Sequence, residues 1–268
     1  MEIAGYISAI GIGIVLGLMG SGGGILTLPL LVYLFHIDAL TAATYTFFII
    51  GVTSLAGLGS YYRSGDVCMR SAVALGIPSV SAVYFTRSYL LPTIPAELME
   101  IQGFVITKSS FLALLFAVVM LLASRSMIGA RQTANTASPA LRRNYFRVIL
   151  EGCCIGTVCG LIGVGGGFLI IPALVLFGKL SMKKAVGTSL SVIAVQSFIG
   201  FLSSEERSGI NWNFLILMSV ISIAGIMIGV SLSRKVDGKM LQPLLGYAMM
   251  LMSLWMIVKE TLLKGYLI

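Results

Sequence analysis

The sequence predicts an all-α polytopic membrane protein with about eight transmembrane segments, arranged as two tandem homologous repeats. Three observations lead to this prediction: an apolar composition, apolar runs long enough to cross a bilayer, and a glycine-rich motif that occurs twice. Of the 268 residues, 57% are hydrophobic and 10% are charged, and the mean hydropathy is +1.00. Soluble domains carry roughly 25% charged residues, so this composition indicates a chain embedded in lipid.

The apolar runs give the expected segments, since a helix needs about 20 apolar residues to cross a bilayer. A basic, polar stretch at 125–146 separates four runs from the next four. It predicts a linker between a first repeat at 1–124 and a second repeat at 147–268. The runs are 3–35, 41–62, 69–91, 103–124, 147–178, 183–203, 212–233 and 240–258.

The glycine-rich motif lies in the first run of each half. Gly17-Leu-Met-Gly-Ser-Gly-Gly-Gly continues to Pro29, and Gly160-Leu-Ile-Gly-Val-Gly-Gly-Gly continues to Pro172. The two copies are offset by 160 − 17 = 143 positions. Irregular backbone is tolerated in a membrane only where protein or a water-filled cavity surrounds it. Broken helices at matching places in two halves are typical of a transporter binding site.

The sequence does not determine whether the chain crosses the membrane or turns back after each break. The stretch after each triple glycine spans roughly 16 Å as a helix, about half a bilayer, which favours one broken element over two crossings. If these stretches are re-entrant, the two repeats are inverted instead of parallel. Lys and Arg are divided too evenly between the two sets of loops for the positive-inside rule to orient the chain.

The triple glycines have the chemistry of an anion site. Glycine allows positive φ, so three in a row expose backbone N–H groups, and the helix that follows adds partial positive charge. The bland alternative is close helix packing through small residues, which we expect for the pairs Gly13/Gly17 and Gly156/Gly160. The glycines predicted to bind are Gly22, Gly23, Gly24, Gly165, Gly166 and Gly167.

A polar stripe follows each motif. Hydroxyl and amide groups can hold an oxyanion without fixed charge, although such residues also form ordinary hydrogen bonds between membrane helices. Thr46 and Thr53, seven positions apart, lie on one helix face, and Ser189 and Gln196 repeat this face at the offset of 143. The side chains predicted to line the site are Thr46, Thr53, Ser54, Thr188, Ser189, Gln196 and Ser197.

Few residues indicate proton coupling, metal binding, nucleic-acid binding or catalysis. Glu151 lies inside the fifth run and is a candidate for a coupling proton, with pairing to Arg147 as the alternative. The four cysteines lack a metal-ligand spacing and read as packing residues. The +8 net charge comes from residues that sit mostly between apolar runs, which does not indicate a nucleic-acid partner. We expect no enzyme activity, no cofactor and no metal.

The two motifs, with Ala185-Val-Gly-Thr-Ser-Leu190, resemble the TauE/SafE sulfite exporter family over nearly the whole chain. The resemblance implies a multi-pass inner-membrane protein of seven or eight spans that moves sulfite, sulfonates or other small organosulfur anions. In the first copy, Tyr45 stands where the second copy has a small hydroxyl residue. We expect this tyrosine to narrow an asymmetric site.

The sequence therefore predicts a transporter, with export as the expected direction, that moves small sulfur-containing anions by alternating access. The expected partners are that anion and the lipid bilayer. An anion channel of the same fold and a non-transporting membrane assembly component remain as alternatives. The coupling ion and the oligomeric state, including a homo-oligomer, are left open.

Overall fold

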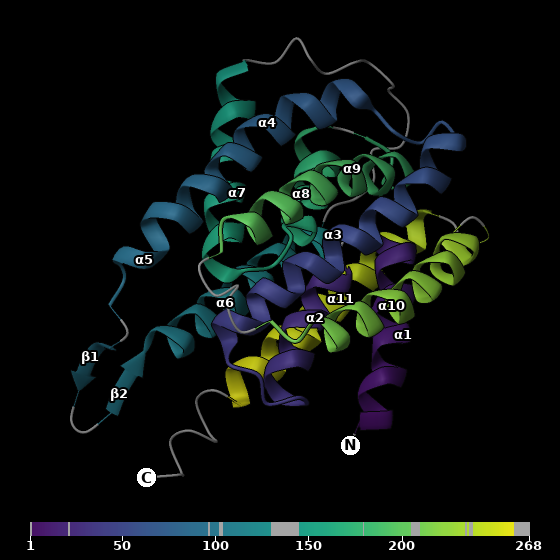
Figure 1. Ribbon diagram of the computed structural model, residues 1–268. Helices are drawn as coiled ribbons and strands as arrows, with labels where there is room; N and C mark the ends of the chain where they lie inside the picture. Colours follow the sequence, from purple (N-terminus) through teal and green to yellow (C-terminus); the bar gives the residue numbers. More distant parts are fainter. Residues whose placement is uncertain are drawn as a thin grey trace.

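A computed structural model describes residues 2–20, 22–95, 97–101, 104–129, 145–178, 180–204, 210–233, 235 and 238–259. Within these ranges the chain forms a bundle of helices with one short hairpin at its edge (Figure 1). In chain order the elements are α1 (Glu2–Met19), α2 (Gly22–Tyr33), α3 (Ala39–Arg63), α4 (Met69–Phe85), the π-helical turn η1 (Thr86–Leu90), α5 (Leu91–Thr93), β1 (Glu97–Ile101), β2 (Phe104–Thr107), α6 (Lys108–Gly129), α7 (Tyr145–Ile162), α8 (Gly167–Pro172), the π-helical turn η3 (Ala173–Phe177), α9 (Met182–Leu202), α10 (Trp212–Ser233) and α11 (Gly238–Val258).

The helices have the character of membrane spans. Among the described residues, four helical stretches are long and apolar enough to cross a bilayer: Ala39–Arg63, Ser110–Ile128, Met182–Leu202 and Trp212–Ser233. Val148–Ile162 and Pro243–Val258 are shorter apolar helices. Large apolar side chains point outward around the bundle, as lipid-facing residues do and as those of soluble monomers rarely do. Examples are Leu55, Ile77, Leu122, Val220 and Leu251. The protein is therefore an α-helical membrane protein.

One element differs from the expectation for the fourth segment. The sequence run begins at 103, whereas the structure pairs β1 with β2 in an antiparallel hairpin and starts α6 at Lys108. Val105, Ile106 and Thr107 are β-branched residues, which favour extended backbone, and hydropathy alone does not register this preference. At its other end α6 continues to Gly129, beyond the boundary expected at 124. Residues 130–144, most of the expected linker, lie outside the described part.

Both glycine motifs interrupt a helix. α1 ends at Met19, and Gly20 has a φ of 68°. α7 ends at Ile162, and Gly163 and Gly166 have φ values of 81° and 68°. A positive φ is a conformation that glycine adopts at little cost and other residues avoid. Gly20 and Gly163 are separated by the same 143 positions as the motifs, so both copies break at the same place.

The relative directions of the central helices follow from their contacts. A Cβ on Gly200 of α9 would meet Phe47 of α3, and a Cβ on Gly187 would meet Tyr61, so α3 and α9 are antiparallel. α10 runs parallel to α3, because Tyr45 contacts Asn211 and Tyr61 contacts Ser233. We call the end of the bundle where α3 begins the Asp38 end, and the end where α4 begins the Cys68 end.

Closely packed glycines give the directions of the two broken helices. Gly13 of α1 lies against Gly225 of α10, and Gly17 lies against Gly229, so these helices are parallel. In the same way Gly156 of α7 lies against Ser79 of α4, and Gly160 lies against Thr86. The packing role predicted for these glycine pairs is confirmed. α7 is thus parallel to α4, and α4 is parallel to α9, because Cys68 contacts Thr188 and Gly76 lies against Val192. α1 and α3 therefore run in one direction, and α7 and α9 run in the opposite one.

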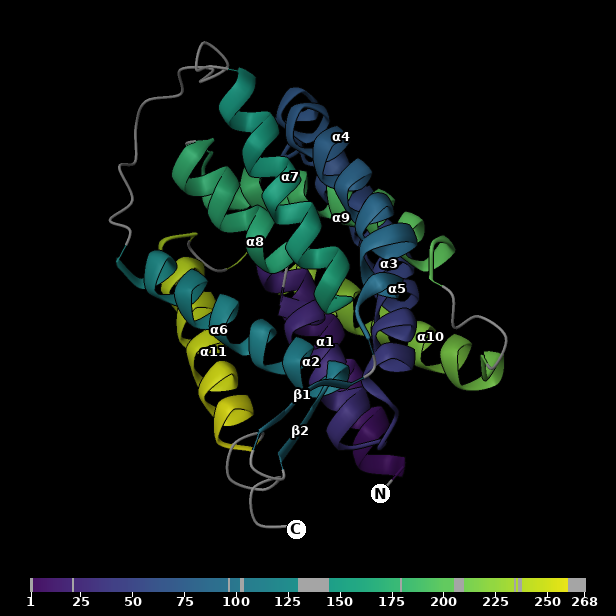
Figure 2. The same cartoon turned by 90° about the vertical axis from the view of Figure 1, so that its left-hand side faces the viewer.

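The packing of the bundle follows the same pairing. α1 packs against α10 and α7 against α4, while α3 packs against α9 and α6 against α11 (Figures 1 and 2). Each broken helix thus rests on a helix from the other half of the sequence. α3 and α9 contribute many of the buried residues and lie between the two broken helices. This arrangement places both breaks against buried faces of α3 and α9.

Candidate functional site

The second break faces two polar side chains of α9. A Cβ on Gly166 would lie 2.8 Å from both Nε2 and Oε1 of Gln196, and 3.1 Å from Sγ of Cys159. A Cβ on the neighbouring Gly165 would overlap Oγ of Ser197. The glycines therefore let an amide and a hydroxyl come directly against the main chain. Gly165, Gly166, Gln196 and Ser197 are all predicted site residues, and the structure brings these four together.

Several of these polar groups are buried without a protein partner. Gln196 and Ser197 are fully buried, and neither the amide of Gln196 nor the hydroxyl of Ser197 has a hydrogen-bond partner among the described residues. Thr46 and Ser54 of α3 are also buried and have unpartnered hydroxyls. Buried polar groups are nearly always hydrogen-bonded to protein, water or a ligand. Such a group of donors and acceptors is therefore suited to a polar ligand or to water.

The two motifs meet near the middle of the bundle. A Cβ on Gly24 would lie 2.7 Å from Cγ1 of Val164 and 3.0 Å from Cδ1 of Ile50. Ile50 also lies 3.0 Å from the position of a Cβ on Gly165. The first turn of α2 and the second break are thus neighbours on α3. Gly22 and Gly23 belong to that first turn, and Gly167 begins α8.

Three residues of the predicted stripe have hydrogen bonds within the protein. The hydroxyl of Thr53 donates to the carbonyl of Ile49, one turn earlier in α3. The hydroxyl of Thr188 accepts from the Cys68 backbone N–H at 2.9 Å, near the start of α4. These two contacts stabilise helix geometry and a helix start, which spacing along one helix could not reveal.

The third, Ser189, lies close to the first break. Its hydroxyl donates to the Val186 carbonyl at 2.8 Å and reaches the Gly20 carbonyl at 3.4 Å. A Cβ on Gly20 would also overlap Val186. The corresponding contact at the second break joins Gly163 and Ala43 of α3, one turn before Thr46. Ser189 and Thr46 therefore lie near opposite breaks.

Two expectations about the site need correction. The triple glycine does not leave every backbone N–H available, because the N–H of Gly166 donates to the Val164 carbonyl in a tight turn. Tyr45 does not face a break: its hydroxyl accepts from the Asn211 backbone N–H at 2.8 Å, and its ring lies near Phe214. Residue spacing places Tyr45 on α3 but does not indicate that α10 begins beside it.

Glu151 is separated from the breaks. It is half-buried in the second turn of α7, 163 − 151 = 12 residues before Gly163. At 1.5 Å per residue this separation is about 18 Å along the helix. Glu151 therefore does not share the second break with Gln196, and its role in coupling stays a prediction.

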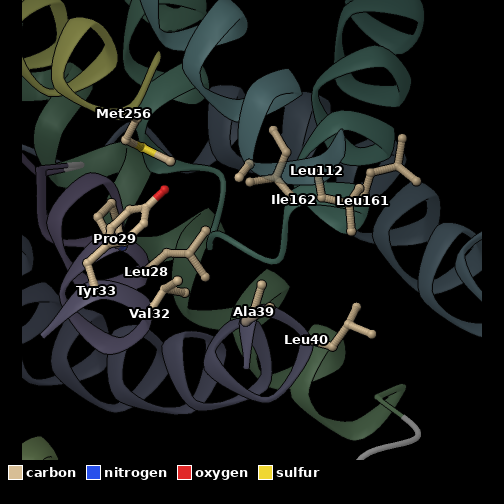
Figure 3. A pocket seen from close by; sticks show the side chains of 12 residues that line it. Leu28, Pro29, Val32, Tyr33, Ala39, Leu40, Leu112, Leu161, Ile162 and Met256 are labelled. Atoms are coloured by element: carbon tan, nitrogen blue, oxygen red, sulfur yellow. The ribbon is translucent and has the colours of Figure 1, made fainter. Parts of the chain in front are cut away.

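An apolar pocket lies beside the second break, toward the Asp38 end. It has a volume of about 230 Å³ and includes Ala43, which touches Gly163. Figure 3 shows α2 on one side of it and residues of α6 and α7 on the other. Its lining is almost entirely apolar, so it offers room but few donors to an anion. The lining residues are Leu28, Pro29, Val32, Tyr33, Ala39, Leu40, Ala43, Leu112, Ala113, Leu161, Ile162 and Met256.

Sequence reasoning missed a cationic pocket at the same end. Arg87 and Lys108 line it together with Thr44 and Ser204, and its volume is about 70 Å³. The available signal was Arg87 itself, because an arginine at the end of an apolar run can remain inside the protein. Among the described residues, no group of three or more His, Cys, Asp or Glu side chains could hold a metal ion.

Comparison with known proteins agrees with a membrane transporter. The chain is 29% identical to a probable membrane transporter protein of Xylella fastidiosa, over 88% of each chain. It is 26% identical to the probable membrane transporter protein YdhB of Bacillus subtilis, over 81% of this chain and 84% of the relative. A probable membrane transporter protein of Methanocaldococcus jannaschii is 25% identical, over 96% and 94%. No solved structure matches the chain significantly.

The family comparison covers nearly the whole sequence. Residues 6–256 match the family described as Sulfite exporter TauE/SafE. This range includes both glycine motifs, both predicted polar stripes and the cationic pocket. The helical bundle, its outward apolar residues and this match lead to one conclusion: the chain is a membrane transporter that belongs to the TauE/SafE family.

Proposed function

We propose that this protein transports small sulfur-containing oxyanions such as sulfite or sulfonates, and that it holds them between the two glycine breaks. The proposed donors are Gln196 and Ser197 at the second break, with Thr46 and Ser54 from α3. The family description names sulfite, and sulfite is a small oxyanion that accepts several hydrogen bonds. The proposed location is the cell inner membrane, and export is the proposed direction.

The observation that carries the proposal is the buried amide of Gln196. An amide with neither its donor nor its acceptor satisfied costs about 1–3 kcal/mol, and such a group is retained where it has another use. The amide lies against the irregular main chain at Gly166, where there is no room for the Cβ of any other residue. A bound oxyanion would accept from the amide N–H and from the Ser197 hydroxyl.

The directions of the helices support a transport mechanism. α1 and α3 run opposite to α7 and α9, a relation typical of inverted repeats in secondary transporters. We propose that residues 1–124 and 147–268 are such repeats, each with four predicted segments. In each repeat the first segment contains a re-entrant break. The Gly20 break lies toward the Cys68 end and the Gly163 break toward the Asp38 end. Movement of one repeat against the other would then expose the site to each side in turn.

Neutral donors suit a carrier, because a binding site must also release its substrate. A charge-assisted hydrogen bond is roughly twice as strong as a neutral one, so amide and hydroxyl groups hold an anion less tightly than a buried arginine would. The apolar pocket beside Gly163 is proposed as part of the path from the Asp38 end.

The substitution Gln196→Leu tests the site. It replaces the amide by an apolar side chain of similar size, so we expect unfolding stability in detergent to stay the same or rise, while sulfite binding is lost. Removing an unsatisfied pair of buried polar groups is neutral or stabilising, whereas loss of a structural hydrogen bond lowers stability. Thermal unfolding with and without sulfite measures both effects.

Gly59→Ala serves as the matched control, because Gly59 is exposed on α3 and a Cβ there meets no atom within 4 Å. It should leave both stability and the sulfite-dependent shift unchanged. If Gln196→Leu lowers stability by about 1 kcal/mol or more and keeps the sulfite shift, then Gln196 has a structural role. In that case the proposed site is wrong.

A further inference from the structure

The cationic pocket at the Asp38 end is built around Arg87. This side chain is 3% exposed, although it carries a permanent charge. Its guanidinium donates to Oγ of Ser204 at 2.9 Å and to Oγ1 of Thr44 at 3.4 Å, and lies 5.0 Å from the centre of the Phe47 ring. A charged residue within membrane-spanning helices is costly and usually has a functional role.

Lys108 brings a second positive charge to the same pocket. Its ammonium group, half-buried at the start of α6, donates to the carbonyls of Leu91 and Ile94 and thereby ties α6 to the end of α4–α5. Arg87, Lys108, Thr44 and Ser204 surround a volume of about 70 Å³. This space exceeds what one water molecule needs, and it suits a small ion better than an organic molecule.

The corresponding place in the other half of the sequence is closed. Ser204 aligns with Tyr61 at the offset of 143, since 204 − 143 = 61. The Tyr61 hydroxyl donates to the Gly17 carbonyl at 3.0 Å and lies 2.7 Å from Oγ of Ser233. A tyrosine ring thus stands at the Cys68 end where a serine hydroxyl contacts Arg87 at the Asp38 end. The cationic pocket is therefore a feature of one end of the bundle and not of the shared framework.

Phe47 connects this pocket to the second break. Its ring lies under Arg87 and packs in one cluster with Cys159, and Cys159 in turn lies beside Gly166 and Gln196. The side chains of Phe47 and Cys159 therefore lie between Arg87 and the unpartnered amide of Gln196. A positive pocket with low-dielectric walls raises the local concentration of anions.

We propose that Arg87, Lys108, Thr44 and Ser204 form a second oxyanion site at the Asp38 end, distinct from the site between the breaks. Its ligand is a small free oxyanion such as sulfite or sulfate, held by the two cations, while the Thr44 and Ser204 hydroxyls, which donate to the carbonyls of Leu40 and Gly200, orient the Arg87 guanidinium. The binding does not depend on the proposed function. The further step, in which this site supplies or receives the transported anion across Phe47, rests on it.

Binding of inorganic sulfate to the purified full chain in phosphatidylcholine nanodiscs tests the proposal. Sulfate, compared with sodium chloride at equal ionic strength, should raise the melting temperature of the wild type, because a ligand that binds only the native state stabilises it. Lys108→Gln should weaken sulfate binding about tenfold or more, and Lys108→Arg should largely retain it. Arg70→Gln, which removes an exposed charge from the opposite end of α4, should behave as the wild type does.

The outcomes separate this proposal from the proposed function. Loss of sulfate binding in Lys108→Gln, with sulfite transport at a raised KM and nearly unchanged kcat, supports a loading site. No sulfate shift in the wild type, or equal shifts in Lys108→Gln and Arg70→Gln, overturns it even if Gln196→Leu abolishes transport. Conversely, an effect of Lys108→Gln together with normal transport by Gln196→Leu keeps this site and rejects the one between the breaks.

A lipid phosphate offers the same chemistry as a free oxyanion, so a second set of nanodiscs contains phosphatidylglycerol. If this lipid stabilises the wild type but not Lys108→Gln, and sulfate adds nothing in either lipid, then the pocket binds a headgroup. That result overturns the proposal of a free-anion site.

Discussion

Single glycines in this protein have separate tasks that their positions in the motif do not distinguish. Gly13 and Gly17 allow α1 to pack closely on α10, whereas Gly20 and Gly163 carry the positive φ that ends a helix. Gly166 combines a positive φ, directly before the start of α8, with the space that lets Gln196 approach the main chain. The sequence predicted that these positions matter, but helix packing and ligand access can be separated only when the neighbouring helix is known.

Cys68 gives a residue-scale prediction outside the membrane spans. Burial opposes ionisation of its thiol, but hydrogen bonds from Ser71 and Arg70 and the positive charge of Lys184 outweigh burial, so the pKa of Cys68 lies below its ordinary value. Ser71→Ala removes the contact at 3.3 Å between the Ser71 hydroxyl and the Cys68 sulfur. We therefore expect the pKa of Cys68 to rise in this variant, and its alkylation to be slower near neutral pH.

The rate of iodoacetamide reaction at Cys68, followed by mass spectrometry across a pH series, measures this shift. Since the thiolate is the reactive form, the midpoint of the rate profile should move to higher pH in Ser71→Ala. An unchanged midpoint would show that the Ser71 hydroxyl does not stabilise the thiolate.

At the scale of elements, the broken helices account for what could and could not be predicted. The apolar runs and the glycine motifs located both breaks in the helices, because hydropathy and local backbone conformation depend on residues close together in the sequence. The direction of the chain after a break is not encoded nearby in the sequence, because α2 is too short to show whether the chain continues across the membrane or turns back. That direction depends on contacts of α2 with α3 and with the second break, as at Gly24 beside Ile50 and Val164, about 30 and 140 residues further on. The hairpin before α6 was missed because hydropathy does not separate a β-branched run from the start of a span.

The course of α1 and α2 predicts an accessibility pattern. Because α1 and α3 are parallel, the start of α1 lies at the Asp38 end and the end of α6 lies at the Cys68 end. Single cysteines at Glu2 and Asp38 should therefore react with a membrane-impermeant maleimide from one side of the membrane. A cysteine at Ser126, an exposed residue near the end of α6, should react from the other side.

Eight simple crossings predict a different pattern, so the same labelling decides between them. A straight passage of α1 and α2 through the membrane would put Glu2 and Asp38 on opposite sides, and Glu2 and Ser126 on the same side. Labelling of that kind in sealed vesicles, with detergent-permeabilised vesicles as the reference, would contradict the re-entrant arrangement.

At the scale of the whole molecule, the two halves share a framework and differ in their polar groups. The pairing of α1 with α10 matches that of α7 with α4, and each break meets a small or apolar residue of the opposite central helix. The polar groups are not symmetric: Gln196 faces the second break, whereas Thr53, its counterpart at the offset of 143, bonds to its own helix. Composition predicted a helical membrane protein and the doubled motif predicted two breaks, but this asymmetry arises from rotamers and neighbours that spacing does not determine.

The measurement that tests the central claim most directly is uptake of radiolabelled sulfite into proteoliposomes, with and without unlabelled sulfite inside. We predict saturable uptake that internal sulfite accelerates, as expected for a carrier and not for a channel. Gly165→Ala, whose Cβ would overlap Ser197 and approach Ile50, should abolish this uptake, while Gly59→Ala should retain it. Uptake no greater than in protein-free liposomes, or equal uptake by Gly165→Ala and the wild type, would contradict sulfite transport through the glycine breaks.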